Sequence, residues 1–98
     1  MELKMIEVDG KIQEPKLELI ALSTCGFCKK GMAWLSERDW AYSYIFLDQL
    51  PPDEKSKYKE FFFNTYEQSL SYPTLIINKK SLLVGFIPLI WDEKLSTQ

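Results

Sequence analysis

Two cysteines, Cys25 and Cys28, stand where the pattern of the sequence changes. Residues 17–22 are almost continuously apolar, which predicts a central strand that is covered on both faces. In residues 27–38 the apolar positions recur at helical spacing, and Cys28 begins the inward face of this helix. The cysteine pair therefore lies at a junction between a strand and a helix, and this placement constrains the fold more than any other feature.

The residues before this junction predict an extra strand. Residues 2–8 alternate roughly between polar and apolar, as a half-buried strand would, and Asp9-Gly10 is a strong signal for a tight turn. Residues 11–13 would then return as a short second strand. We expect an N-terminal strand or hairpin that is added to the main fold.

The residues after the junction predict the rest of a sheet and two more helices. Strands are expected at residues 42–47, 74–77 and 81–84, the last two forming an antiparallel hairpin. A helix over residues 52–68 is expected to bury four side chains, namely Tyr58, Phe61, Phe62 and Thr65. A short helix over residues 89–95 closes the chain, with packing candidates Leu89, Ile90 and Trp91.

This order predicts an α/β protein of the thioredoxin fold, with a mixed central sheet flanked by helices. A chain of 98 residues has the length of one domain. We expect a single domain over residues 1–98, in which residues 1–16 are an N-terminal strand extension and residues 17–95 form the core fold.

Composition excludes several classes of function. The chain has no histidine, so proteases with a Cys–His pair and serine enzymes with a histidine base lack a required group. The formal net charge is -2 without a basic stripe, so a nucleic-acid partner is not expected. Acids interrupt every apolar stretch of the N-terminus, so we expect neither a signal peptide nor a membrane span, and the default location is cytoplasmic.

The spacing of Cys25 and Cys28 favours thiol–disulfide exchange, in which the thiolate is the attacking species. A cysteine just before a helix faces unpaired backbone N–H groups and the positive end of the helix dipole, so we expect a lowered pKa for Cys25. Cys28, one turn later, would be sheltered until a mixed disulfide forms on Cys25. Gly26 would permit the tight junction, and Phe27 would cover one flank of the thiols.

Three other interpretations of the cysteines stay open. Zinc or a [2Fe-2S] cluster could be held between two subunits, because a structural zinc site usually takes four ligands and one subunit offers two thiols. The cysteines could also be two inert, packed thiols. The chain could be a non-catalytic interaction module that uses Phe27, Trp40 and Trp91. Within one subunit we expect no metal site.

Cys25-Gly-Phe-Cys28 after an apolar strand, Tyr72-Pro73-Thr74 before another and Gly85 after the hairpin together resemble the glutaredoxin family. The resemblance covers residues 17–95 and is closest to small prokaryotic glutaredoxin-like proteins. It implies that Cys25 is the nucleophile, that Cys28 resolves the mixed disulfide, and that Pro73 is cis. It also implies that the backbone of Tyr72 contacts the substrate. The substrate-binding residues expected from it are Gly26, Phe27, Tyr72, Pro73, Thr74 and Gly85.

The sequence departs from the family pattern where glutaredoxins recognise glutathione. The family's Thr-Val-Pro triplet is replaced by Ser71-Tyr72-Pro73, and only Gly85 is present where glutaredoxins have a Gly-Gly pair followed by an acid. We therefore expect no tightly bound cofactor. The expected partners are a protein or small-molecule disulfide and a thiol reductant, which is either glutathione or a reductase.

Overall fold

The computed structural model describes residues 3–96, which form five strands and three α-helices. In chain order the elements are β1 (Ile6–Val8), β2 (Leu17–Ala21), α1 (Gly26–Glu37), β3 (Tyr42–Phe46), a short 3-10 helix η1 (Leu47–Gln49), α2 (Pro52–Tyr66), β4 (Thr74–Ile77), β5 (Ser81–Val84) and α3 (Pro88–Ser96). The strands lie side by side in the order β1-β3-β2-β4-β5. Strands β2 and β3 run parallel, and the other neighbours run antiparallel. This mixed sheet confirms the predicted thioredoxin fold.

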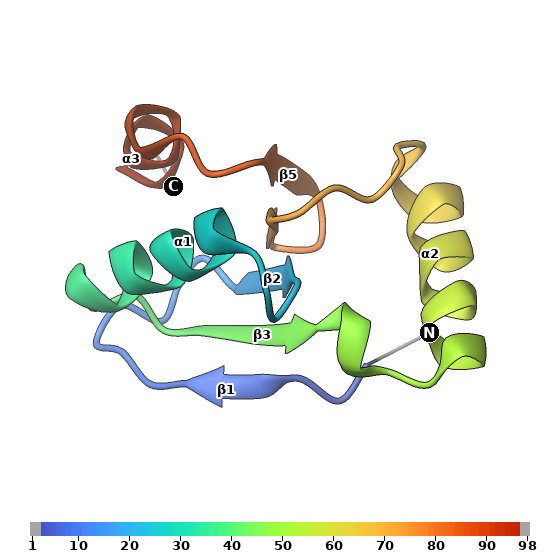
Figure 1. Cartoon of the computed structure of the whole chain (residues 1–98). Coiled ribbons are helices and arrows are strands. Elements are labelled where there is room, and N and C mark those ends of the chain that lie inside the picture. Colours follow the sequence, from blue (N-terminus) through green and yellow to red (C-terminus); the bar gives the residue numbers. More distant parts are fainter. Residues whose placement is uncertain (1–2, 97–98) are drawn as a thin grey trace.

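The sheet separates two packed layers (Figure 1). Successive side chains of a strand point to opposite faces, so Leu17 and Leu19 of β2 pack with the buried residues of α1 and α3. Ile20 of the same strand packs instead with Tyr58 and Phe62 of α2. Helices α1 and α3 therefore cover one face, and α2 covers the other.

The predicted N-terminal strand is present, but the hairpin alternative is wrong. Strand β1 pairs antiparallel with β3, not with the residues that follow it. Ile12 forms only a single parallel bridge with Trp40. Gly10 serves a close approach and not a turn, because a Cβ there would lie 2.5 Å from the backbone nitrogen of Ala41. Thus residues 9–13 run beside the segment that leads into β3.

Several predictions of burial are also corrected. Thr65 is exposed on α2, so only three of the four predicted side chains of that helix are buried or half-buried. Leu89 and Ile90 are exposed on α3, whereas Trp91 is almost completely buried. Trp34 of α1, which the helical pattern did not single out, belongs to the core between α1 and α3. None of the helices in the described part of the chain is long and apolar enough to cross a membrane.

Candidate thiol site

Cys25 is the N-cap residue of α1. Its backbone is extended, with φ -89° and ψ 114°, and its sulfur accepts a hydrogen bond of 3.2 Å from the backbone N–H of Cys28. The first N–H groups of a helix have no partner within the helix, and here the Cys25 sulfur takes that role. The cysteine side chain itself therefore caps the helix. The sulfur is half-buried and points at an N–H donor that stabilises negative charge.

Cys28 lies one turn later and is fully buried. Burial, and next the hydrogen bond with Cys25, raise the pKa of the Cys28 thiol to about 12. Both cysteines are free thiols. The two sulfurs thus share one helical turn but differ in access, because a partner reaches Cys25 first.

A carboxylate holds the loop that leads to Cys25. The backbone N–H of Ser23 donates to Asp48 at 2.8 Å, and the Ser23 hydroxyl donates to the other oxygen of the same carboxylate. These two hydrogen bonds lower the pKa of Asp48. Asp48 is not among the site residues predicted from the sequence. It could have been found, because Ser23 and Asp48 follow the parallel neighbours β2 and β3, and the carboxyl ends of parallel strands lie at one edge of a sheet.

The segment before β4 has the conformation that the resemblance implied. The Tyr72–Pro73 peptide bond is cis, as is the bond between Glu14 and Pro15. Burial, and then electrostatic interactions with Asp48 and Cys28, raise the pKa of Tyr72. Tyr72 is half-buried and packs against the core around Cys28.

Thr74 and Gly85 form hydrogen bonds with the backbone of residues 71–73. Thr74 is buried, and its hydroxyl donates to the carbonyl of Ser71 at 2.6 Å. The N–H of Gly85 donates to the carbonyl of Pro73 at 2.7 Å. Gly85 has φ +77°, a left-handed conformation that favours glycine. Both residues therefore shape the backbone around Pro73, and their contact with a substrate stays a prediction.

Gly26 and Phe27 form the exposed start of α1. A Cβ added to Gly26 would meet nothing within 4 Å, so the described part of the chain has room for a side chain at this position. The Phe27 ring is exposed, and the Lys30 ammonium lies 5.4 Å from its centroid. Open space at Gly26 leaves Cys25 accessible to a large partner.

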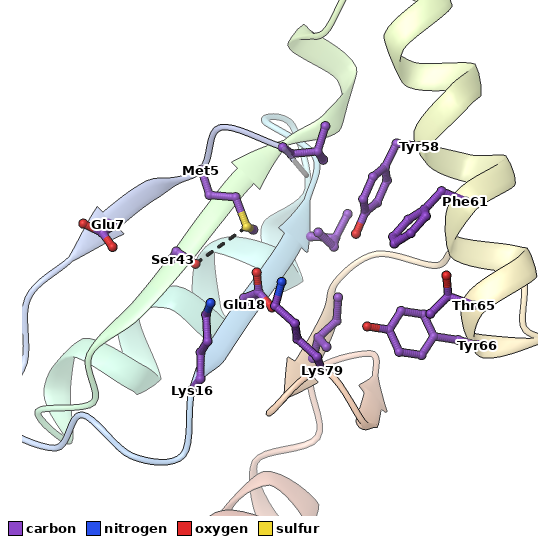
Figure 2. Close-up of a pocket in the computed structure, with 13 residues that line it drawn as sticks. Met5, Glu7, Lys16, Glu18, Ser43, Tyr58, Phe61, Thr65, Tyr66 and Lys79 are labelled. Atoms are coloured by element: carbon purple, nitrogen blue, oxygen red, sulfur yellow. Dashed lines mark hydrogen bonds between the residues drawn. The ribbon is translucent and has the colours of Figure 1, made fainter. Parts of the chain in front are cut away.

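A separate cavity of about 460 Å³ lies between α2 and the sheet (Figure 2). Tyr58, Phe61 and Tyr66 reach it from α2, and Glu18 reaches it from β2. Neither cysteine lines this cavity, so the cavity is separate from the thiol site. No cluster of three or more His, Cys, Asp or Glu side chains that could hold a metal ion occurs within residues 3–96.

The fold and the site together define a dithiol protein of the thioredoxin fold. The structure is similar to that of methanoredoxin from Methanosarcina acetivorans, with 34% identity, a TM-score of 0.76 and 88% of each chain covered. It is also similar to the glutaredoxin of Methanosarcina mazei Go1, with 29% identity, a TM-score of 0.77, and 96% of this chain and 89% of that chain covered. A glutaredoxin from Archaeoglobus fulgidus shares the fold at 21% identity and a TM-score of 0.71, covering 84% of this chain and 87% of that one.

No protein-family model matches the sequence, and no curated protein matches it. The structural similarities nevertheless show the family. The chain belongs to the glutaredoxin-like proteins.

Proposed function

We propose that the protein is a dithiol reductase that reduces disulfides of proteins or small molecules through Cys25 and Cys28. The observation that supports this most directly is the hydrogen bond from the Cys28 N–H to the Cys25 sulfur at the start of α1. This bond aims a donor at the one sulfur that a partner can reach. A reductase of this kind needs a thiol reductant, so we expect it to work in the cytoplasm.

In the first step the Cys25 thiolate attacks one sulfur of the substrate disulfide. The S–S bond of the substrate breaks, and the second sulfur leaves as a thiolate that takes up a proton from water. The product is a mixed disulfide between Cys25 and the substrate. Cys28 stays protonated during this step, because burial raises its pKa to about 12.

In the second step Cys28 attacks the Cys25 sulfur. The Cys28 thiol loses its proton, a Cys25–Cys28 disulfide forms, and the remaining substrate sulfur leaves as a thiol. The substrate has then gained two electrons and the protein has lost two. An external thiol reductant, either glutathione or a reductase, returns the pair to the dithiol state.

Two serine variants test this assignment with hydroxyethyl disulfide as substrate and dithiothreitol as reductant. Cys25→Ser is expected to abolish turnover because it removes the nucleophile. Cys28→Ser keeps the first step. Incubated with hydroxyethyl disulfide in the absence of dithiothreitol, it is expected to accumulate a mixed disulfide, which intact-mass spectrometry detects as a mass increase that later addition of dithiothreitol reverses. Each variant is the matched control of the other, since both replace one sulfur by oxygen in the same helical turn.

Wild-type turnover that survives in Cys25→Ser would disprove the assignment. So would a Cys28→Ser protein in which no mixed disulfide forms although its circular dichroism spectrum is native. An absorption band in the visible range after anaerobic purification would favour instead the cluster-carrying alternative that the sequence left open.

A further inference from the structure

The floor of the cavity between α2 and the sheet carries charged and polar side chains. Glu7 of β1, Ser43 of β3, Glu18 of β2 and Ile76 of β4 are register partners, so they form one row across four neighbouring strands. All four line the cavity. The Ser43 hydroxyl donates to the Met5 sulfur at 3.6 Å, which leaves the Ser43 oxygen able to accept. The row therefore offers two carboxylates and one hydroxyl oxygen to a cation.

Glu18 is the one charged residue in the apolar run of residues 17–22. It is half-buried on the same face of the central strand as Ile20, and it lies opposite Ile76 of β4. Both isoleucines are buried. Removing a carboxylate from water costs free energy unless an opposite charge compensates for it. Packing alone therefore does not account for an acid at this position, whereas a bound cation would.

Positive charge lies at one end of the same cavity. Lys16 and Lys79 both line it. The backbone N–H of Lys16 donates to the Asn78 side-chain oxygen at 2.8 Å, and the Lys16 carbonyl accepts from the Asn78 N–H at 2.9 Å. These bonds fix Lys16 beside the turn that carries Lys79. Lys16 and Glu18 are two residues apart, which is about 7 Å along an extended chain, so the cavity holds neighbouring charges of opposite sign.

The wall that faces this floor is aromatic. Figure 2 shows the rings of Tyr58, Phe61 and Tyr66 reaching from α2 toward the sheet. Burial, and then electrostatic interactions with Tyr66 and Glu18, raise the pKa of Tyr58, so its hydroxyl stays protonated at neutral pH and can donate. Aromatic rings bury apolar groups, and their faces also attract an ammonium group. The wall therefore suits a ligand with an apolar body.

The size and chemistry of the cavity together define a class of ligand. Its volume of about 460 Å³ lies in the usual range for sites that bind small molecules, which is about 300–1,000 Å³. A simple ion would leave the aromatic wall unused, and a purely apolar molecule would cover the charges of Glu18 and Lys16 without pairing them. An α-amino acid carries an ammonium and a carboxylate on the same carbon, beside its side chain. A large apolar amino acid therefore matches all three features.

We propose that the cavity between α2 and the sheet binds a free α-amino acid with a large apolar side chain. The ammonium group lies beside Glu18, the carboxylate is held by Lys16, and the side chain packs against the rings of Tyr58 and Phe61. This site is separate from the thiols and does not depend on disulfide exchange.

Four probes test which parts of the ligand are recognised. L-phenylalanine has all three parts, phenethylamine lacks the carboxylate, 3-phenylpropionate lacks the ammonium, and glycine lacks the ring. Titration of the reduced ¹⁵N-labelled protein at neutral pH, followed by amide NMR shifts, measures each affinity and locates the site. We expect L-phenylalanine to bind with a Kd of about 1 mM or lower. Each of the other probes is expected to bind about ten-fold more weakly, because each lacks one charged or apolar contact.

Three variants connect these contacts to named side chains. Glu18→Gln is expected to weaken L-phenylalanine about ten-fold and to leave 3-phenylpropionate, which has no ammonium, within two-fold. Lys16→Met is expected to weaken L-phenylalanine about ten-fold and to leave phenethylamine, which has no carboxylate, within two-fold. Glu60→Gln is the matched control, because Glu60 is exposed on α2 and does not line the cavity. It is expected to change no affinity.

The shifted amides are expected to include those of Glu18, Ser43 and Tyr66, and not those of the two cysteines. Absence of shifts at the cavity up to about 20 mM L-phenylalanine would overturn the proposal. So would equal wild-type affinities for L-phenylalanine and 3-phenylpropionate, or unchanged binding of L-phenylalanine to Glu18→Gln. The same spectra show whether each variant is folded, and the series of probes on the wild-type protein is decisive even if one variant is not.

Discussion

The two faces of the sheet are built from the same strands but are covered differently. On the face of α1 and α3, three aromatic rings interlock, with Trp34 and Phe86 both edge-on to Trp91. On the other face, α2 lies over only part of the sheet and leaves a cavity of about 460 Å³ (Figure 2). We call the first the closed face, because buried rings fill the contact between α1 and α3, and the second the open face, because it contains the cavity.

The difference shows which kind of packing surrounds the two thiols. Cys25 and Cys28 lie at the edge of the closed face, where α1 is held by buried rings on its inner side. Gly31 lets Trp91 approach α1 closely, since a Cβ at this position would lie 3.0 Å from the Trp91 ring. The cavity on the open face contains tyrosines, lysines and carboxylates but no nucleophilic sulfur. The two thiols thus belong to the layer with the interlocking rings, and the larger space lies on the other side of the sheet.

The largest expected effect is the contrast between the two thiols. A pKa of about 12 for Cys28, against an ordinary value of 9.0, leaves about a thousand-fold less thiolate at pH 8, and burial also blocks the reagent. In Cys25→Ser the contributions of Cys25 to this pKa are removed but the burial of Cys28 stays, so iodoacetamide is expected to label Cys28 about ten-fold or more slowly in the native protein than in the unfolded protein. Mass spectrometry over time measures both rates. Equal rates would show that Cys28 is not sheltered.

The next effect compares one large buried side chain on each face. Trp91→Ala and Phe62→Ala each remove a fully buried ring, and each is expected to lower the free energy of unfolding by about 3–5 kcal/mol. Only Trp91 also binds the carbonyl of Gly85 and packs against α1. Trp91→Ala is therefore expected to lower kcat/KM for hydroxyethyl disulfide about ten-fold or more, because small displacements of reacting groups are costly. Phe62→Ala is expected to change it less than two-fold.

Urea unfolding gives the stabilities, and the kinetic assay is run at a temperature where both variants are folded. Equal kinetic losses in the two variants would mean that the closed face has no special connection to the thiols. Wild-type kinetics in Trp91→Ala would lead to the same conclusion.

Local patterns predicted the parts of the fold that depend on neighbours in sequence. The helical spacing after Cys25 placed Cys28 on the inward face, where it is buried. The partner of β1 was not predictable in this way, because Asp9-Gly10 has the same signature for a hairpin turn as for a close approach to the backbone of Trp40 and Ala41. Whether β1 pairs with β3 or with the residues that follow it depends on contacts between segments that are distant in the sequence, and local patterns do not contain this information.

The same distinction applies to the thiol site. The spacing of Cys25 and Cys28 was enough to predict which sulfur is sheltered, since the helix period decides it. The hydrogen bonds between Ser23 and Asp48 join residues 25 positions apart, so the parallel pairing of β2 and β3 indicates them and neither local sequence does by itself. Leu89 and Ile90 were expected in the core because of their apolar side chains alone. Their exposure became visible only when the direction of α3 was known.

A smaller effect concerns the loop between β2 and α1. The hydrogen bonds from Ser23 lower the pKa of Asp48 from its ordinary value of 3.8. The stability that they provide is therefore complete above that value and is lost as the pH falls through the lower pKa of the folded state. Ser23→Ala keeps the backbone donor and removes the hydroxyl. Its melting temperature is expected to lie below that of the wild type at pH 5–7, and the gap is expected to narrow toward pH 2. A gap that stays constant over this range would show that the carboxylate is not involved.

The smallest expected effect lies in the cavity. Burial, and then the charge of Glu18, raise the pKa of Tyr66, so the Tyr66 hydroxyl stays protonated at neutral pH. Tyr66→Phe removes this hydroxyl and keeps the ring that packs against Phe62, with a centroid distance of 4.8 Å. Because the change is near the surface and far from both thiols, we expect stability within about 0.5 kcal/mol of the wild type and unchanged kcat/KM. A large loss of turnover in Tyr66→Phe would connect the open face to disulfide exchange and remove the distinction between the two layers.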